Sequence, residues 1–285
     1  SEVTRVNCGY IATSEKMEDH TIETMELQSR RDDESYARNL LSGDILSFDE
    51  DTISWILNHI DCFVNQSRGN VSVKQLYLPY VRPHASFNGH DDDVWDKVGQ
   101  AVGNFQSLMF IEMCSNDEYD EDDYSDEDED EDSPILDWNM LARILRHVRQ
   151  SVKVTINDFP HLRTIEEVQP FARAIRGHPT ITSFVDRGMF PYESLDTFYS
   201  ALATLSALES ITLDAPEVRQ ADESTLACPA ESLSELLRVP SLRSVCFRRF
   251  SFTRALCQAT ANALMDGTVA TTLKFIACSL LAEQS

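Results

Sequence analysis

The nearest approach to a metal-binding cluster in this sequence is the segment RPHASFNGHDDD. It holds His84 and His90, followed by Asp91–Asp93. Imidazole and carboxylate groups bind zinc when a fold fixes them close together. The three aspartates, however, directly precede a helical apolar pattern that includes Trp95 and Val98, and acidic residues stabilise the positive end of a helix. We therefore predict that these aspartates begin a helix, and we predict no metal site.

The common catalytic and nucleotide-binding motifs are absent from the sequence. It contains no G-x-S-x-G, H-E-x-x-H, G-x-x-x-x-G-K or G-x-G-x-x-G pattern, and its seven histidines are dispersed. The seven cysteines include no C-x-x-C pair, and several lie in apolar segments, where a free cysteine packs as a small hydrophobe. We therefore predict that the protein is not an enzyme, needs no cofactor and lies in a reducing compartment, the cytoplasm or the nucleus.

An acidic run lies inside the chain. Thirteen of the sixteen residues from Asp117 to Asp132 are acidic, and without them the formal net charge of −24 would be −11. Like charges without apolar residues favour a disordered segment. The run favours a basic protein as the partner. The scattered Lys and Arg residues argue against nucleic acid, and no stretch approaches the roughly 18 apolar residues of a membrane helix.

Internal repeats organise most of the chain. Four segments share a helical apolar stretch, a turn and apolar residues spaced L-x-x-L-x-L: VGQAVGNFQSLMFIEM, FARAIRGHPTITSFVD, FYSALATLSALESITL and LSELLRVPSLRSVCF. In each, the last helical and the first strand apolar residues lie six apart, as Val102 and Leu108 do. Three looser copies give about seven units, with strands near 73–79, 108–114, 152–157, 181–187, 208–214, 242–248 and 273–279.

These units predict a parallel sheet with helices on one side, because each strand alternates with a helix. The pattern resembles the ribonuclease-inhibitor type of leucine-rich repeat, which also occurs in Ran GTPase-activating protein and in nucleotide-binding innate sensors. The resemblance implies an α/β leucine-rich-repeat solenoid, a curved parallel sheet with outer helices. The family's Asn beyond the strand appears only as Asn116, so we expect irregular units. The alternative is a non-repeating α/β domain.

We predict two parts of the chain. Residues 1–48, with NLLSGDIL as their only apolar cluster, form an N-terminal segment that is partly disordered or caps the first repeat. Residues 49–285 form the solenoid, interrupted by a disordered acidic insertion at 116–133. Because terminal repeats need a cap, we expect either a longer natural chain or a poorly protected last strand.

Candidate binding residues follow from the alternation of side chains along a strand. The leucines of each L-x-x-L-x-L point inward, so the residues between and beside them lie on the concave face. Exposed aromatic and arginine side chains are common binding hot spots. We predict that the partner-binding residues are Tyr77, Phe110, Glu112, Lys153, Asn157, Arg187, Asp214, Arg248 and Phe275. Alternatively, terminal segments cover Tyr77 and Phe275 at the two ends of the sheet.

A cluster of positive charge lies around the strand SLRSVCFRRFSFTR, with Arg243, Arg248, Arg249 and Arg254. Either it attracts an acidic partner or the acidic run, or its members are surface arginines without a binding role. We therefore predict a noncatalytic protein-protein interaction module that binds through the concave sheet and an acidic loop. Two alternatives stay open: a regulator of the GTPase-activating type, and an acidic chaperone of histones or other basic proteins.

Overall fold

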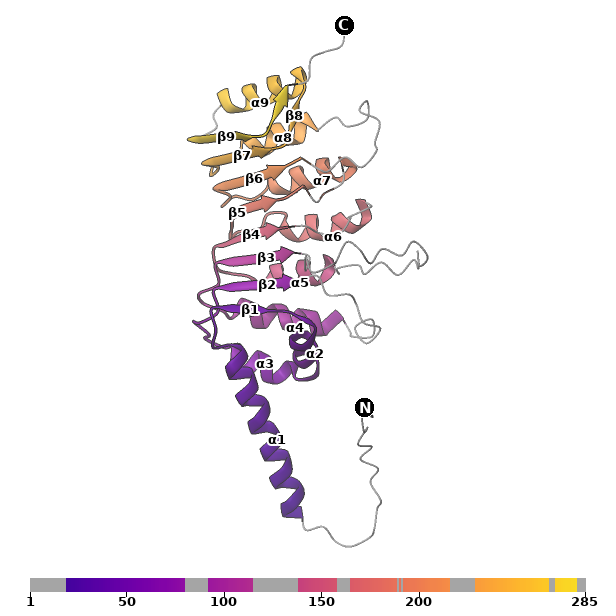
Figure 1. Cartoon of the computed structure of the whole chain (residues 1–285), viewed down its shortest axis with the longest axis vertical. Coiled ribbons are helices and arrows are strands. Elements are labelled where there is room, and N and C mark those ends of the chain that lie inside the picture. Colours follow the sequence, from indigo (N-terminus) through magenta and orange to yellow (C-terminus); the bar gives the residue numbers. More distant parts are fainter. Residues whose placement is uncertain are drawn as a thin grey trace, which may run out of the picture.

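An eight-stranded parallel sheet runs through the protein (Figure 1). The computed structural model describes residues 19–79, 92–114, 138–157, 165–188, 190, 192–215, 229–266 and 270–280. The strands follow one another in sequence order, each paired with the next. They are β1 (Ile45–Ser47), β2 (Gln75–Pro79), β3 (Phe110–Cys114), β4 (Val152–Ile156), β5 (Ile181–Asp186), β6 (Ser210–Asp214), β7 (Ser244–Arg248) and β9 (Thr272–Ile276). The predicted α/β class with a parallel sheet is confirmed.

The helices between the strands lie on one side of the sheet, and each packs against the next (Figure 1). Within the described residues they are α2 (Glu50–Asn58), α3 (Ile60–Ser67), α4 (Asp92–Gly103), α5 (Trp138–His147), α6 (Ile165–Ile175), α7 (Tyr192–Leu202), α8 (Ala230–Leu237) and α9 (Arg254–Met265), and α1 (Asp19–Leu40) precedes β1. A small parallel pair, β8 (Ser251–Phe252) and β10 (Ser279–Leu280), lies at the C-terminal end.

Period-two burial separates the two faces of the sheet. Val152, Val154 and Ile156 of β4 are fully buried, whereas Lys153 and Thr155 between them are only half-buried. The buried residues face the helices, where side chains such as Phe171, Phe184 and Phe198 form one aromatic cluster. The other face, which we call the open face, is not covered by any helix in the described part of the chain. A β-strand with one buried face requires this alternation.

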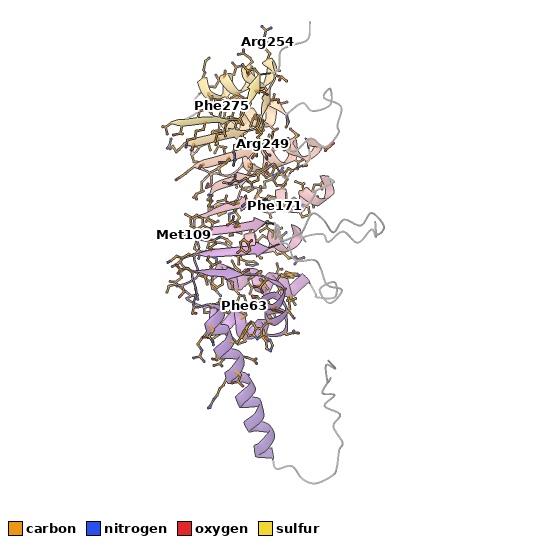
Figure 2. The ribbon with its side chains drawn as sticks, in the orientation of Figure 1. Phe63, Met109, Phe171, Arg249, Arg254 and Phe275 are labelled. Atoms are coloured by element: carbon orange, nitrogen blue, oxygen red, sulfur yellow. The ribbon has the colours of Figure 1, made fainter. Side chains whose placement is uncertain are left out.

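The N-terminal segment contributes a strand that the sequence analysis did not predict. β1 pairs with β2, and Leu46 and Phe48 occupy inward positions that are almost fully buried. The sheet therefore begins four residues before the predicted boundary between 48 and 49. Helix α1 packs against α3, and its Tyr36 ring lies 4.7 Å from that of Trp55. Figure 2 shows Phe63 near this end of the molecule and Phe275 near the opposite end.

The last strand is shifted relative to the prediction. Leu273 pairs with Val245 and Phe275 with Phe247, so Leu273 and Phe275 lie on the helix side. The prediction that Phe275 lies on the open face is therefore wrong. Its error came from starting the last L-x-x-L-x-L unit at Leu273, whereas the register makes Ala270 the equivalent starting position. A shift of three residues exchanges the two faces, because side chains alternate with a period of two.

Candidate functional site

The open face is hollowed along its middle strands. A cavity of about 460 Å³ lies there, with Glu112, Lys153, Asn157, Arg187 and Arg248 among the residues that line it. Its residues come from β2 to β9, and most of them were expected on this face. Parallel packing of the strands brings together residues that lie more than 150 positions apart in the sequence. The hollow is therefore the candidate functional surface.

A chain of hydrogen bonds crosses the face from β2 to β5. Glu112 accepts at one carboxylate oxygen from Nε2 of Gln75 at 3.0 Å and at the other from Nδ2 of Asn157 at 2.7 Å. Oδ1 of Asn157 in turn accepts from Nε of Arg187 at 3.1 Å. The amide of Asn157 therefore links a carboxylate to a guanidinium. Such connected contacts restrict the rotamers of exposed side chains and give the face a defined shape.

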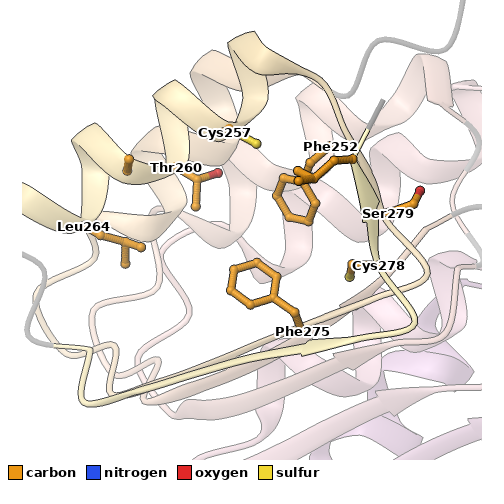
Figure 3. A pocket seen from close by; sticks show the side chains of 9 residues that line it. Phe252, Cys257, Thr260, Leu264, Phe275, Cys278 and Ser279 are labelled. Carbon is orange, nitrogen blue, oxygen red and sulfur yellow. The ribbon is translucent and has the colours of Figure 1, made fainter. Parts of the chain in front are cut away.

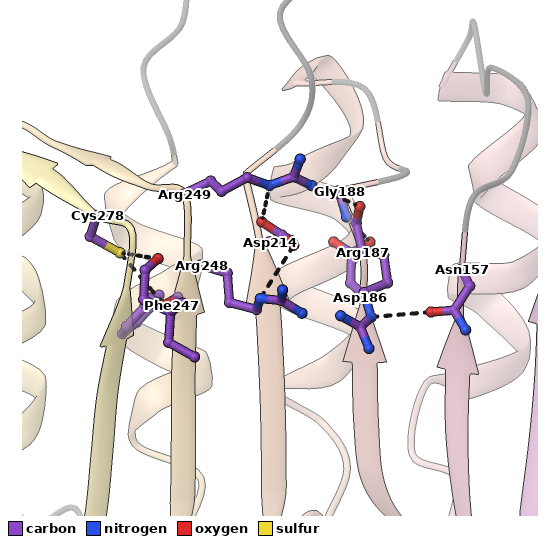
Figure 4. Close-up of polar contacts among 10 residues, drawn as sticks. Asn157, Asp186, Arg187, Gly188, Asp214, Phe247, Arg248, Arg249 and Cys278 are labelled. Atoms are coloured by element: carbon purple, nitrogen blue, oxygen red, sulfur yellow. Dashed lines mark hydrogen bonds and ion pairs between the residues drawn. The ribbon is translucent and has the colours of Figure 1, made fainter.

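Asp214, at the end of β6, lies between two arginines, Arg248 of the neighbouring strand and Arg249 of the turn that follows it (Figure 4). Nε of Arg249 donates to Oδ1 of Asp214 at 2.7 Å, and Nε of Arg248 lies 3.7 Å from Oδ2. Asp214 is only 2% exposed. The prediction that it is an exposed contact residue is therefore wrong, because the arginine side chains cover its carboxylate. Asp214 holds the two arginine side chains in place, and its own carboxylate is not accessible to a partner.

The chain turns sharply beyond the strand ends at equivalent positions. Gly188, Arg249 and Ala277 have positive φ values of 83°, 56° and 53°. Register places each of them two residues beyond an inward position of its strand. At Gly188 a Cβ atom would lie 2.6 Å from the carbonyl oxygen of Ala215, so glycine is required there. At Arg249 a non-glycine residue adopts this unfavourable conformation, and its side chain reaches back to Asp214.

Asp186 is a polar residue that the sequence analysis did not single out. It is fully buried at an inward position of β5, and its Oδ1 accepts from the backbone N–H of Gly188 at 3.0 Å. A carboxylate at the inward position of an apolar strand, followed by Arg-Gly, was the sequence signal for it. The contact helps to set the left-handed turn that follows β5.

The remaining predicted residues fall into two groups. Phe110, Glu112, Lys153, Asn157, Arg187 and Arg248 line the hollow. Tyr77 lies on the same face, half-buried and paired in register with Ser47 of β1, so it is not at the edge of the sheet. Of the predicted arginine cluster, Arg248 and Arg249 adjoin the hollow, whereas Arg243 and Arg254 are exposed away from it. Figure 2 shows Arg254 at the C-terminal end of the molecule.

Phe275 instead lines an apolar pocket between β9 and α9 (Figure 3). The pocket has a volume of about 430 Å³, and Phe252, Cys257, Thr260 and Leu264 also line it. Phe275 stacks on Phe247 with ring centroids 5.7 Å apart, yet it stays 53% exposed. The last strand therefore completes the core less fully than the central strands do.

Two side chains, His178 and Cys62, have shifted pKa values. The pKa of His178 lies below its ordinary value, because burial disfavours the charged ring. The hydrogen bond of the ring to the carbonyl oxygen of Leu145, at 2.7 Å, opposes this shift but is the smaller effect. Partial burial, and then the carboxylates of Asp33 and Glu34, raise the pKa of the Cys62 thiol. Both groups lie away from the hollow.

Neither a metal centre nor a membrane helix is found in the described part of the chain. No group of three or more His, Cys, Asp or Glu side chains there is arranged to hold a metal ion. His84 and His90 lie outside the described residues, as does the acidic run. No helix described by the structure combines the length and apolar character that crossing a bilayer requires. No family model matches the sequence, and no curated protein matches it.

Proposed function

We propose that this protein is an irregular leucine-rich-repeat solenoid of the ribonuclease-inhibitor type. It is a noncatalytic interaction module that binds another protein on the open face. The exposed, polar character of that face is the observation that supports this function. Parallel sheets are almost always covered on both faces. Here one face is packed against helices, and the other presents half-buried polar side chains over several neighbouring strands.

The repeat assignment rests on the order of the elements and on their spacing. Strands and helices alternate along the chain, each strand pairs with the next, and the inward positions are apolar in almost every strand. Repeats that contact only their neighbours produce extended binding surfaces. The acidic run, between β3 and α5, is the second part of the proposal and supplies negative charge for basic groups on the partner.

Affinity capture with a blocked open face tests this function. Thr212 is half-buried on the open face and lines the hollow, so Thr212→Trp would fill the middle of the hollow with an indole ring. Ala255→Trp adds the same side chain at an exposed position on α9 and serves as the matched control. We expect that Thr212→Trp no longer captures the protein that binds the native chain, whereas Ala255→Trp still captures it. Circular dichroism spectra should show that both variants are folded. Equal capture by the two variants would contradict the proposal.

A further inference from the structure

We propose that Arg187 and Arg248 form a carboxylate-binding site in the hollow and that this site takes an acidic segment of the partner protein. This inference rests on the proposed function, because it names the chemistry that the open face recognises. Four properties of the described residues support it: the shape of the floor, the unused hydrogen-bond donors at its margin, the fixed positions of both arginines, and the sign of the local charge.

Small side chains form the floor of the hollow. Register aligns Thr155, Val185, Thr212 and Cys246 in one row across β4 to β7. Beside the hollow, the next row across β5 to β7 contains Ser183, Ser210 and Ser244. Because these side chains are short, they leave room above the sheet for a peptide segment. Longer side chains border this floor: Glu112 of β3, Lys153 of β4, Arg187 directly after β5 and Arg248 of β7.

Both arginines keep donors for a ligand. Nε of Arg187 donates to Asn157, and Nε of Arg248 is held near Asp214 at 3.7 Å. The terminal nitrogens of the two guanidinium groups make no hydrogen bond or ion pair within the described residues. Figure 4 shows Arg248 reaching toward Arg187 along the strand ends. A guanidinium group with two free N–H groups matches the two oxygens of a carboxylate.

The two arginines are positioned before any ligand binds. Asn157 accepts a hydrogen bond from Arg187, and Asp214 lies beside the guanidinium of Arg248. Nη2 of Arg249 also contacts the carbonyl oxygen of Arg187 at 3.5 Å. This contact joins the turn after β7 to the end of β5. Fixing donors in advance lowers the conformational entropy that binding must remove, and therefore favours affinity.

The charge of the open face differs in sign from that of the chain. Lys153, Arg187, Arg248 and Lys274 lie on it, whereas the carboxylate of Asp214 is already paired and that of Glu112 accepts from two amides. The whole chain carries −24. A short acidic segment would meet only the local positive charge, whereas a nucleic acid would also bring many phosphates near the negative remainder. The charges therefore favour an acidic peptide.

Titration of the full chain with a labelled peptide of eight glutamates tests the site, with a peptide of eight glutamines as the probe control. We expect Arg187→Gln and Arg248→Gln each to weaken binding of the glutamate peptide by about tenfold or more. Arg243→Gln and Arg254→Gln remove the same charge from exposed positions outside the hollow, and we expect less than a twofold effect. Arg187→Gln leaves the Asp214 contacts intact, so its effect cannot come from their loss.

Three results would overturn the inference: equal weakening by all four variants, no binding of the glutamate peptide, or preferential binding of a single-stranded oligonucleotide through Arg187 and Arg248. The test can fail separately from the proposed function. If Thr212→Trp abolishes capture but the glutamate peptide does not bind, the open face binds a partner of different chemistry. If the peptide binds through the arginines but Thr212→Trp leaves capture unchanged, the carboxylate site stands and the proposed function fails.

Discussion

Nε of Arg249 donates a 2.7 Å hydrogen bond to Oδ1 of Asp214, a carboxylate that is only 2% exposed. The two residues lie 35 positions apart, at the ends of neighbouring strands. Arg249 makes this contact from a left-handed backbone conformation with φ of 56°. The contact therefore fixes a turn and joins two strand ends.

Asp214→Asn should lower the free energy of unfolding by about 1–3 kcal/mol, because it removes a charge-assisted hydrogen bond from a buried carboxylate. The arginines are partly exposed, so solvent limits the loss. Asp266→Asn is the matched control, since Asp266 pairs with Arg238 at 3.3 Å but is 62% exposed, and we expect less than about 0.5 kcal/mol there. Urea denaturation measures both. Equal losses would show that the burial of Asp214 has no energetic consequence.

Gly188→Ala should destabilise the protein more than Gly177→Ala does. Both glycines have positive φ, 83° and 68°, so both substitutions introduce the left-handed strain of about 1–2 kcal/mol. Only at Gly188 would the new Cβ also meet a backbone oxygen, 2.6 Å away on Ala215, whereas nothing lies within 4 Å at Gly177. We expect about 1–3 kcal/mol of additional loss at Gly188. Thermal denaturation of the two variants provides the comparison. Similar midpoints would show that the backbone oxygen of Ala215 does not crowd a Cβ atom at position 188.

His178 should make stability depend on pH below neutrality. Burial lowers its pKa in the folded protein, so the unfolded chain takes up a proton near pH 6.5 before the folded chain does. Its contribution to stability is therefore constant above that pH and is lost as the pH falls toward the lowered value. The slope reaches at most about 1.4 kcal/mol per pH unit for one proton.

His178→Gln provides the control for this titration. The glutamine amide retains a donor for the carbonyl oxygen of Leu145, which the histidine ring contacts at 2.7 Å, but it does not ionise. Urea denaturation between pH 5 and 7.5 should show that the native protein loses more stability than His178→Gln as the pH falls. Parallel curves for the two proteins would exclude His178 as the source.

Deletion of Asp117–Asp132 should leave the free energy of unfolding unchanged or raise it, because it removes thirteen like charges and shortens the connection between β3 and α5. Binding to a basic partner should weaken, and its salt dependence should disappear. A variant with the thirteen carboxylates replaced by amides separates charge from length. Unfolding of the deletion, or an unchanged salt slope, would contradict the prediction. This run lies outside the described residues.

The register of the sheet decided which predictions of the open face were right. Phe110, Glu112, Lys153, Asn157, Arg187 and Arg248 line the hollow as their positions between inward leucines implied. Phe275 does not line the hollow, because it pairs in register with Phe247, an inward residue of β7, and therefore lies on the helix side of the sheet. β1 was missed since it has only three residues, although the spacing of Leu46 and Phe48 repeats that of Leu76 and Leu78.

The sequence by itself determined the alternation of strands and helices and the side of each central strand that packs into the core. Both follow from local periodicity, because one face of each element must be apolar. Only the tertiary structure decided how the polar residues combine. Asp214 and Arg249 are far apart in sequence, and whether a carboxylate is exposed or covered depends on the side chains that neighbouring strands place over it. Hydrogen bonds between strands depend on register and turn geometry, and no local pattern encodes these.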